Sequence, residues 1–311
     1  MKNLKIIVII LTAAMAILLF LISNSTPKMQ NNKPMISVTT FALYDIIKHI
    51  ALDTVEIVNI LPFGVDPHSF EPTPQLMAKI EKSTLVIYSG AGLEPWVDGF
   101  NFKSKTLNIS KYVKLRKLDA HEYELHRHHD QQGIHTTTDP HYWLDFTNMQ
   151  RATEVITQVL VKLLPQNKIL YEQNKQKYEE MLHRLDAIYK KNLSQCKSDT
   201  VVVSHNALGY LSHKYNFHVE SLTGLSPEAE PSAKDVTRIM KDIKKEGVST
   251  IFFEHFVNDR VIKRIAKDTD ITIDVFQPLG NITKDEAQKH LTYQDIMKQN
   301  LEKLSKALMC N

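Results

Sequence analysis

Short apolar runs alternate with amphipathic segments over most of the chain. The apolar runs have the length and β-branched composition of buried strands, and the segments between them repeat apolar residues at helical spacing. The runs that we predict as strands are 36–39, 55–61, 85–88, 106–109, 200–204, 217–222, 250–253 and 271–276. The segments that we predict as helices are 41–52, 74–82, 148–164, 166–193, 207–213, 232–246, 259–268 and 293–308. This alternation predicts an α/β protein with parallel sheets covered by helices.

The segment 166–193 is the longest predicted helix, and it separates the strand–helix units into two groups. It contains neither Gly nor Pro, and its apolar residues mostly recur at helical spacing. Its 28 residues would span about 42 Å as a helix, enough to connect two domains. We therefore predict βα domains over residues 26–165 and 195–311, joined by a linker helix over 166–194. The alternative is an ordinary surface helix within one domain.

The first 25 residues have the pattern of a secretory signal. Lys2 and Lys5 precede an apolar run over 6–22, and the small residues Ser23 and Ser25 suit a signal peptidase. We predict a signal peptide over residues 1–25 and a periplasmic protein, with an uncleaved membrane anchor as the alternative. Because no cysteine follows the apolar run, a lipid attachment site of the bacterial lipoprotein kind is not expected here.

The composition is that of an ordinary globular protein, with 43% hydrophobic and 23% charged residues. Loss of the signal would lower the net charge from +3 to +1 because it removes two lysines and no acids. This balance gives no reason to expect a nucleic-acid partner. The two cysteines, Cys196 and Cys310, could form a disulfide in an exported protein, and two free thiols are the alternative.

Six histidines lie between positions 121 and 141, and histidine is the side chain most used to bind transition metals at neutral pH. Five of them belong to a polar stretch, residues 119–138, that also contains acidic residues: His121, His126, His128, His129 and His135. The sixth, His141, stands between Pro140 and two aromatic residues. The contrast predicts a weak, fast-exchanging metal-binding loop beside one fixed ligand.

Four histidines occur just after predicted strands or in Pro-bounded turns: His68, His141, His205 and His255. Ligands of parallel sheets bind outside the carboxyl ends of the strands, so such residues can converge on one cleft. Three imidazoles and one oxygen ligand suit Zn²⁺. Taken singly, each of these histidines could equally be an ordinary hydrogen-bonded side chain.

Several phrases of the chain, in this order, resemble the zinc and manganese solute-binding proteins of bacterial ABC importers. They are residues 65–74 (VDPHSFEPTP), 139–145 (DPHYWLD), 204–210 (SHNALGY), 226–232 (SPEAEPS), 251–254 (IFFE) and 278–280 (PLG). The resemblance covers nearly the whole chain from position 36 to 308. It implies two βα domains bridged by one long helix, with the metal between the domains.

The resemblance also implies a ligand set. The first, second and third ligands of the family match His68, His141 and His205, and a histidine at the third position favours zinc over manganese. The family commonly has Asp before the Pro-Leu-Gly phrase as fourth ligand, whereas this chain has Gln277. We favour three histidines plus water and keep Gln277 as a candidate for the fourth position. The carboxylates Asp274, Glu254 and Glu71 are further candidates for it.

The function that the resemblance implies is a high-affinity zinc receptor. It would capture Zn²⁺ as transported ligand outside the inner membrane and deliver it, as a monomer, to an ABC permease with its ATPase. The histidines at 121–135 would assist as an accessory metal-binding loop. A zinc hydrolase that uses three histidines and a bound water is one competing function, and a metal-binding adhesin or storage protein is another. The chain lacks a His-Glu-x-x-His motif, which disfavours the hydrolase.

Overall fold

The computed structural model of the chain describes residues 33–120, 122–124, 137–225, 230–254 and 260–311, together with Met15. Close contacts group Pro34–Asn311 into one unit and set Met1–Lys33 apart as another. The predicted signal peptide, apart from Met15, lies outside the described residues. No helix in the described part of the chain combines the length and hydropathy needed to cross a bilayer. The unit that starts at Pro34 contains both of the four-stranded sheets.

The first sheet has four parallel strands in the order β2-β1-β3-β4. In chain order these are β1 (Met35–Val38), β2 (Glu56–Asn59), β3 (Leu85–Tyr88) and β4 (Lys105–Asn108). The helices of this half are α2 (Phe41–Ala51), α3 (Pro74–Ile80) and the short α4 (Pro95–Asp98). Buried apolar side chains fill β1 and β3, the central strands, as their near-continuous apolar sequences predict.

The second sheet repeats the arrangement of the first with the order β10-β9-β7-β8, again all parallel. Its strands are β7 (Thr200–Val203), β8 (His218–Ser221), β9 (Thr250–Phe253) and β10 (Thr272–Val275). Its helices are α8 (Gly209–Tyr215), α9 (Ala233–Glu246) and α10 (Arg260–Thr269). In both sheets the first strand pairs with the second on one side and the third on the other. The predicted α/β class with parallel sheets is confirmed.

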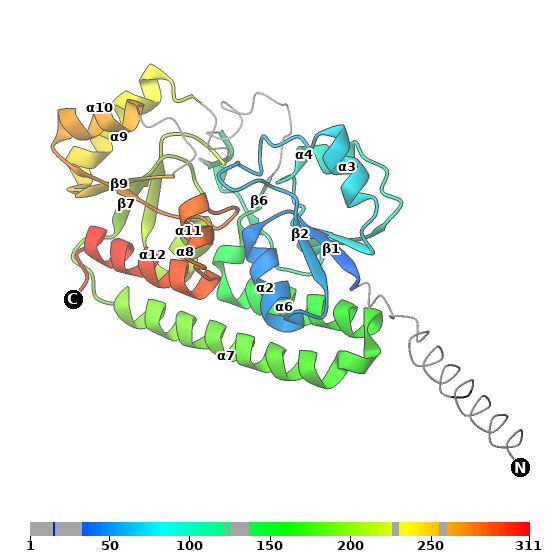
Figure 1. The fold of residues 1–311 in the computed structure, drawn as a ribbon. Coiled ribbons are helices and arrows are strands. Elements are labelled where there is room, and N and C mark those ends of the chain that lie inside the picture. Colours follow the sequence, from blue (N-terminus) through cyan, green and yellow to red (C-terminus); the bar gives the residue numbers. More distant parts are fainter. Residues whose placement is uncertain (1–14, 16–32, 121, 125–136, 226–229, 255–259) are drawn as a thin grey trace, which may run out of the picture. The chain divides into compact units, whose positions relative to one another are not determined.

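The long helix predicted between the two groups is present as α7 (Lys168–Asn192). A short 3₁₀ turn, η3 (Pro165–Asn167), precedes it and separates it from α6 (Phe146–Leu163). Figure 1 shows α7 running beside α6 and α2 at one end and α12 (Tyr293–Ala307) at the other. The Tyr178 hydroxyl donates to Asp45 on α2 at 2.7 Å, and that of Tyr189 donates to the Met297 carbonyl at 2.6 Å. The helix is therefore fixed to both halves, whereas the domain boundaries at 165 and 194 stay a prediction.

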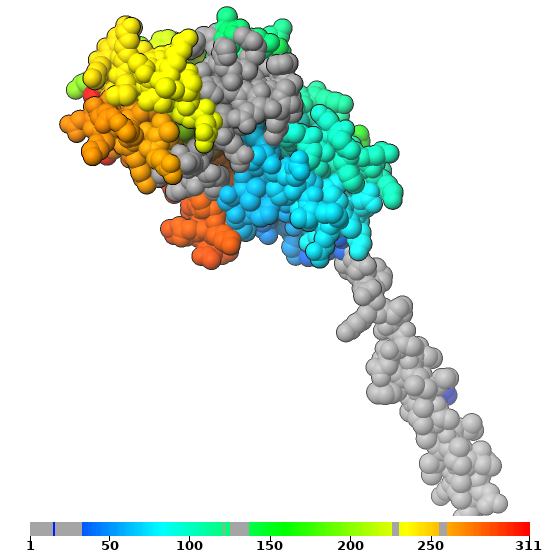
Figure 2. Space-filling view, turned by 90° about the horizontal axis from the view of Figure 1, so that it is seen from above, coloured from blue at the N-terminus to red at the C-terminus, as the bar shows by residue number. Residues whose placement is uncertain are grey.

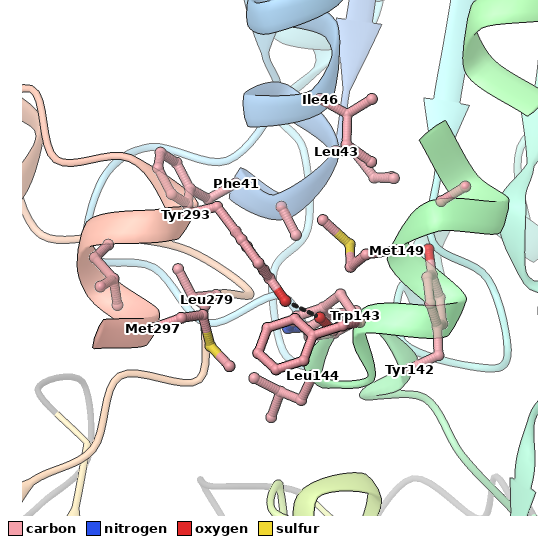
Figure 3. Packing of buried hydrophobic residues seen from close by; sticks show 14 of the residues in the cluster. Phe41, Leu43, Ile46, Tyr142, Trp143, Leu144, Met149, Leu279, Tyr293 and Met297 are labelled. Carbon is pink, nitrogen blue, oxygen red and sulfur yellow. Dashed lines mark hydrogen bonds between the residues drawn. The ribbon is translucent and has the colours of Figure 1, made fainter. Parts of the chain in front are cut away.

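One large apolar core joins the two halves. Figure 3 shows its part around Trp143, where residues of α2, α6 and α12 meet the segment after β10. The Trp143 indole donates to the Pro278 carbonyl at 2.6 Å, and the Tyr293 hydroxyl donates to the Trp143 carbonyl at 2.6 Å. Trp143 lies in the 3₁₀ turn η2 (Tyr142–Leu144) directly after His141. The turn that carries His141 is thus held by residues of the C-terminal half.

A smaller core lies under α9 and α10. Ser232 and Asp235 form a capping box at the start of α9, each side chain bonding to the other's backbone N–H. Seen from above in Figure 2, the side chains of α9 and α10 (yellow and orange) gather at one end of this unit. The residues around α3 (cyan) gather at the other. α3 and the pair α9 and α10 therefore lie on separate parts of this face.

Several short elements have no counterpart among the predicted ones. They are the two-residue antiparallel strands β5 (Arg116–Lys117) and β6 (Thr138–Asp139), the turns η1 (Ile109–Lys111) and η2, and the helices α4 and α11 (Lys284–Gln288). Elements this short have no periodicity that a sequence pattern could reveal. The β5–β6 pair matters most, because its register sets Arg116 opposite Asp139.

Cys196 and Cys310 form a disulfide, so the bond and not the pair of free thiols is present. They also pair as an isolated antiparallel bridge. The Ser249 hydroxyl donates to the Ala307 carbonyl at 3.0 Å close by. The disulfide therefore connects the segment after α7 to the end of α12, two elements of the same C-terminal half.

Candidate metal centre

The same tripeptide, Asp-Pro-His, presents two of the three predicted ligands. The Asp66 carboxylate accepts from the backbone N–H of His68 at 3.0 Å, and that of Asp139 accepts from the N–H of His141 at 2.9 Å. The proline between them restricts the backbone, and the aspartate closes a tight turn. These turns therefore fix the backbone at each histidine, although neither histidine lies in a helix or a strand. The repeated tripeptide indicates, from the sequence alone, that His68 and His141 have the same role.

The third predicted ligand stands at the carboxyl edge of the second sheet. His205 follows β7, and Glu254 directly follows the neighbouring strand β9. The strand order of this sheet reverses between β7 and β9, and such a switch point opens a crevice outside the strand ends. Both residues are largely buried. The position of His205 thus agrees with the expectation drawn from its place after an apolar strand.

The structure brings His68, His141 and His205 together. One nitrogen from each ring lies within 4.8 Å of the others. The Nε2 atoms of His68 and His141 are 3.2 Å apart. Two nitrogens bound tetrahedrally to one Zn²⁺ at 2.0–2.1 Å would be about 3.4 Å apart, so this pair already has a suitable spacing. Three imidazoles from distant parts of the chain therefore surround one point.

A carboxylate lies at Nδ1 of each of the two buried imidazoles. Nδ1 of His141 is 2.8 Å from Oδ1 of Asp139, and Nδ1 of His205 contacts Oε1 of Glu254. A carboxylate at Nδ1 fixes the tautomer that leaves Nε2 free to bind a metal. Nε2 of His205 is buried and has no hydrogen-bond partner among the described residues. Such buried polar atoms are rare, and a bound cation would satisfy this one.

The charges around the cluster favour a cation. Burial alone would raise the pKa of Asp139, but its hydrogen bond to His141 and the charges of His141 and Arg116 lower it below its usual value. Burial alone would lower the pKa of His205, yet the charge of Glu254 and the hydrogen bond to it raise that pKa. Asp139 is therefore an ionised acceptor at neutral pH. Protons compete with a metal for His205.

The cavity at the cluster has a volume of about 20 Å³. Besides the histidines and Glu254, it is lined by Asp66, Pro67, Trp143, Pro278, Gly280 and Asn281. A volume of roughly 10–15 Å³ by this measure accommodates one water molecule. The cavity between the histidines therefore has room for a single ion with a small fourth ligand.

The structure places Gln277 away from the cavity. Its side-chain amide donates to the Glu286 carboxylate at 2.9 Å, and its side-chain oxygen accepts from the Leu279 N–H at 3.2 Å. Asp274 lies 3.6 Å from Lys303 instead of at the cluster. Of the oxygen ligands considered from the sequence, Glu254 lines the cavity, where it contacts His205. Asp66 and Asn281 line it as well.

The remaining residues of interest have different positions. The loop histidines His121, His126, His128, His129 and His135 lie outside the described residues, and so does His255. Asp145 caps α6, accepting from the Thr147 N–H at 2.8 Å, so it serves as a helix cap. No sequence pattern points to Arg116, whose guanidinium donates to Asp139 at 2.9 Å. An arginine opposite an acid on a two-residue strand leaves no recognisable signal.

Comparisons with known proteins agree with this geometry. The family described as "Zinc-uptake complex component A periplasmic" matches residues 36–307. The High-affinity zinc uptake system protein ZnuA of Bacillus subtilis is 32% identical over 278 residues, which cover 88% of this chain and 87% of that protein. The Zinc-binding lipoprotein AdcA of Streptococcus pneumoniae is 31% identical over 291 residues. That match covers 92% of this chain but only 58% of AdcA.

A solved structure has the same fold. The Zn(II)-bound ZnuA-like domain of Streptococcus pneumoniae AdcA superposes with a TM-score of 0.73 at 28% identity, covering 89% of this chain and 99% of that domain. The family match extends through both sheets, the long helix α7 and the segments that carry the three histidines. The fold, the histidine cluster and the family match over 36–307 therefore agree, and the chain belongs to the family of periplasmic zinc-uptake components.

Proposed function

We propose that this protein is a zinc receptor that captures Zn²⁺ outside the inner membrane and delivers it to an ABC permease with its ATPase. The observation that carries the proposal is the convergence of three imidazoles on a cavity of about 20 Å³, with the buried Nε2 of His205 left without a partner among the described residues. Relatives named as zinc-uptake and zinc-binding proteins support it. The signal-like N-terminus supports an exported location. The family is described as periplasmic, and the Streptococcus pneumoniae relative is named as a lipoprotein, which supports it as well.

Capture would use the Nε2 atoms of His68, His141 and His205 as ligands, with water in the fourth position. Imidazole is a borderline ligand that suits Zn²⁺, whereas Mg²⁺ and Mn²⁺ prefer oxygen. Asp139 and Glu254 hold two of the rings and add negative charge beside the cation. The donor atoms would thus favour Zn²⁺ over Mg²⁺ and Mn²⁺.

We further propose that only small movements accompany binding in a monomer with domains 26–165 and 195–311. The packing of α7 on α2, α6 and α12, and the shared core around Trp143, support a fixed arrangement of the two halves. Solution scattering of the zinc-free and zinc-loaded protein should give nearly equal radii of gyration. A large interdomain rotation would contradict this part of the proposal.

The decisive experiment measures zinc affinity by competition with a chelator of known affinity. The variants His68→Ala, His141→Ala and His205→Ala should each lose the tight site, with affinity falling on the order of 100-fold or more, because one of three protein ligands is gone. His183→Ala, which removes an exposed histidine on α7, is the matched control and should bind as the parent does. Parent-like binding by all three ligand variants would refute the proposed site.

The competing functions have less support. A hydrolase would need a substrate site beside the metal, whereas the matching family and the Bacillus subtilis relative are named for zinc uptake. Ester or peptide hydrolysis by the zinc-loaded protein, well above the rate with free Zn²⁺, would favour a hydrolase. A storage protein or adhesin would not need a partner permease. Stimulation of the permease–ATPase complex by the zinc-loaded protein would therefore favour the receptor.

A further inference from the structure

A chain of side-chain hydrogen bonds connects the segment that carries His141 to the segment that carries His205. Asp139, which holds His141, accepts from Arg116 Nη2 at 2.9 Å. Nη1 of Arg116 donates to Oε2 of Glu122 at 2.8 Å. The other oxygen of Glu122, Oε1, accepts from the side-chain amide of Asn206 at 2.9 Å. Asn206 directly follows His205.

Glu122 is the residue at which this chain of bonds passes from one half of the protein to the other. Arg116 and Asp139 belong to the β5–β6 pair of the N-terminal half, whereas Asn206 lies in the loop after β7 of the second sheet. A carboxylate suits this position because both of its oxygens accept, and its partners Arg116, Asn206 and the Asp119 N–H are all donors. Glu122 and Arg116 are less than one-fifth exposed, so water screens their ion pair only in part.

The surrounding packing leaves this bridge little freedom. Gly209 begins α8, and a Cβ on it would lie 2.0 Å from Nη2 of Arg116 and 2.6 Å from Oδ2 of Asp139. The Tyr210 hydroxyl donates to the Asp139 carbonyl at 2.8 Å and accepts from the Arg116 N–H at 2.8 Å. The start of α8 therefore rests directly on the Arg116–Asp139 pair, and the guanidinium cannot move aside without disturbing it.

We propose that Glu122 is a positioning residue that holds the His141 and His205 segments together across the metal site and thereby slows the release of zinc. The inference rests on the proposed function, since it assigns a role in retaining the same ion. The three imidazoles come from both halves, and the bridge resists any separation of His141 from His205. Glu122 does not contact the incoming ion, so its loss should change dissociation more than association.

The test is an exchange of donor and acceptor between Glu122 and Asn206. Glu122→Gln leaves one acceptor oxygen for three donors. Arg116 and the Asp119 N–H share one oxygen of Glu122, so the link to Asn206 is the one that is lost. Asn206→Asp sets two carboxylates against each other and breaks the same link. In the double variant E122Q/N206D, the new amide at position 122 can donate to the new carboxylate at position 206 and accept from Arg116. The net charge of the double variant equals that of the parent.

The measurement is the rate at which zinc passes from each protein to an excess of chelator, followed by stopped flow. Groups that orient metal ligands typically change affinity by 10–100-fold, so each single variant should release zinc about tenfold faster or more. The double variant should return to within about threefold of the parent rate. Glu302→Gln, an exposed site on α12, is the matched control and should have no effect.

Three outcomes would overturn the inference. If the parent binds zinc tightly and Glu122→Gln releases it at the parent rate, Glu122 has no positioning role and the proposed function stands. If the parent binds no zinc, the proposed function fails and the inference with it. If the single variants release zinc faster only because they are less stable, the double variant will release it as fast as they do. A return of the double variant to near the parent rate therefore distinguishes positioning from a loss of stability.

Discussion

The two sheets have the same strand order, yet the switch points at their carboxyl edges differ in chemistry. In the first sheet, between β1 and β3, the buried carboxylate of Glu94 accepts from the Thr39 hydroxyl and from the backbone N–H groups of Ser89 and Gly90. In the second sheet, between β7 and β9, Glu254 meets His205, whose Nε2 has no partner among the described residues. At the first edge, the buried carboxylate is satisfied by hydrogen bonds within the protein, and we call it the closed edge. At the second edge, a buried ring nitrogen has no partner among the described residues, and we call it the open edge.

The two sheets thus have equivalent switch points in their strand order but differ in whether the buried polar atoms there find partners within the protein. Buried polar groups in native proteins are nearly always paired, so an internally paired acid such as Glu94 is a structural group. A buried imidazole nitrogen without a partner indicates that something outside the protein completes it. Matched substitutions at the two edges can therefore test this contrast.

Zinc bound at the histidine cluster, which includes His205 of the second edge, should strongly stabilise the folded protein. At a free zinc concentration 1,000 times the dissociation constant, binding adds about 4 kcal/mol to the free energy of unfolding. We expect this gain in the parent and less than about 1.5 kcal/mol in His205→Ala at the same free zinc, since that variant has lost most of its affinity. Urea denaturation with and without buffered zinc measures both values.

Glu94→Gln is the corresponding variant at the first edge and should gain the full zinc stabilisation, although its starting stability differs. If zinc stabilises Glu94→Gln no more than it stabilises His205→Ala, the two edges are not independent. The contrast between them would then be wrong, because the closed edge would contribute to metal binding.

Glu94 should give the zinc-free protein a distinct pH dependence. Burial raises the pKa of Glu94 from 4.5 to about 7, outweighing its hydrogen bonds with Thr39, Gly90 and Ser89, which lower it. Because the folded state holds this proton more tightly than the unfolded state, the stabilisation is complete below about pH 4.5 and is lost as the pH rises through about 7. A shift of this size corresponds to about 3 kcal/mol.

The measurement compares the free energy of unfolding of the parent and of Glu94→Gln between pH 4.5 and 8 in the presence of a chelator. The glutamine does not titrate, so the advantage of the parent over the variant should fall by about 3 kcal/mol over this range. A constant difference would mean that Glu94 stays ionised throughout, held by its three donors, and that its edge is closed by charge as well as by hydrogen bonds.

Glu254→Gln should weaken zinc binding by about 10–100-fold, or roughly 1.4–2.8 kcal/mol, because the amide is a poorer acceptor for Nδ1 of His205 and lacks the negative charge. Chelator competition at neutral pH measures the loss. Glu94→Gln, the same chemical change at the other edge, should bind within about threefold of the parent. Equal losses in the two variants would remove the distinction between a closed edge and an open one.

The regular elements of both sheets could be predicted because strand and helix periodicities are strong and local. β3 and β9 have the predicted bounds, and the other strands differ by one or two residues at an end. Position after strands or in Pro-bounded turns pointed to four histidines, His68, His141, His205 and His255, and the family resemblance selected the first three of them. Local sequence therefore reveals which side chains stand at a sheet edge.

The partners of those side chains could not be predicted in the same way. Arg116 contacts Asp139 only because the two-residue strands β5 and β6, which are separated in sequence by residues 118–137, pair with each other. Glu122 accepts a hydrogen bond from Asn206, which belongs to the other half of the protein. Such contacts depend on three-dimensional packing, and no residue spacing encodes them. For the same reason the sequence left Glu254 as one of several oxygen candidates, whereas the structure places it at Nδ1 of His205.

Gln277 should have the smallest effect on zinc binding, although it occupies the position at which the family commonly has an acidic ligand. Its amide is bound to Glu286 and to the Leu279 N–H, so it helps to hold the segment after β10 and does not reach the cavity. Gln277→Ala should leave zinc affinity within about threefold of the parent. It should lower the free energy of unfolding by about 1–2 kcal/mol, since buried hydrogen bonds are lost. A tenfold loss of affinity with unchanged stability would instead make Gln277 the fourth ligand, and the open edge would then draw on β10 as well as on β7 and β9.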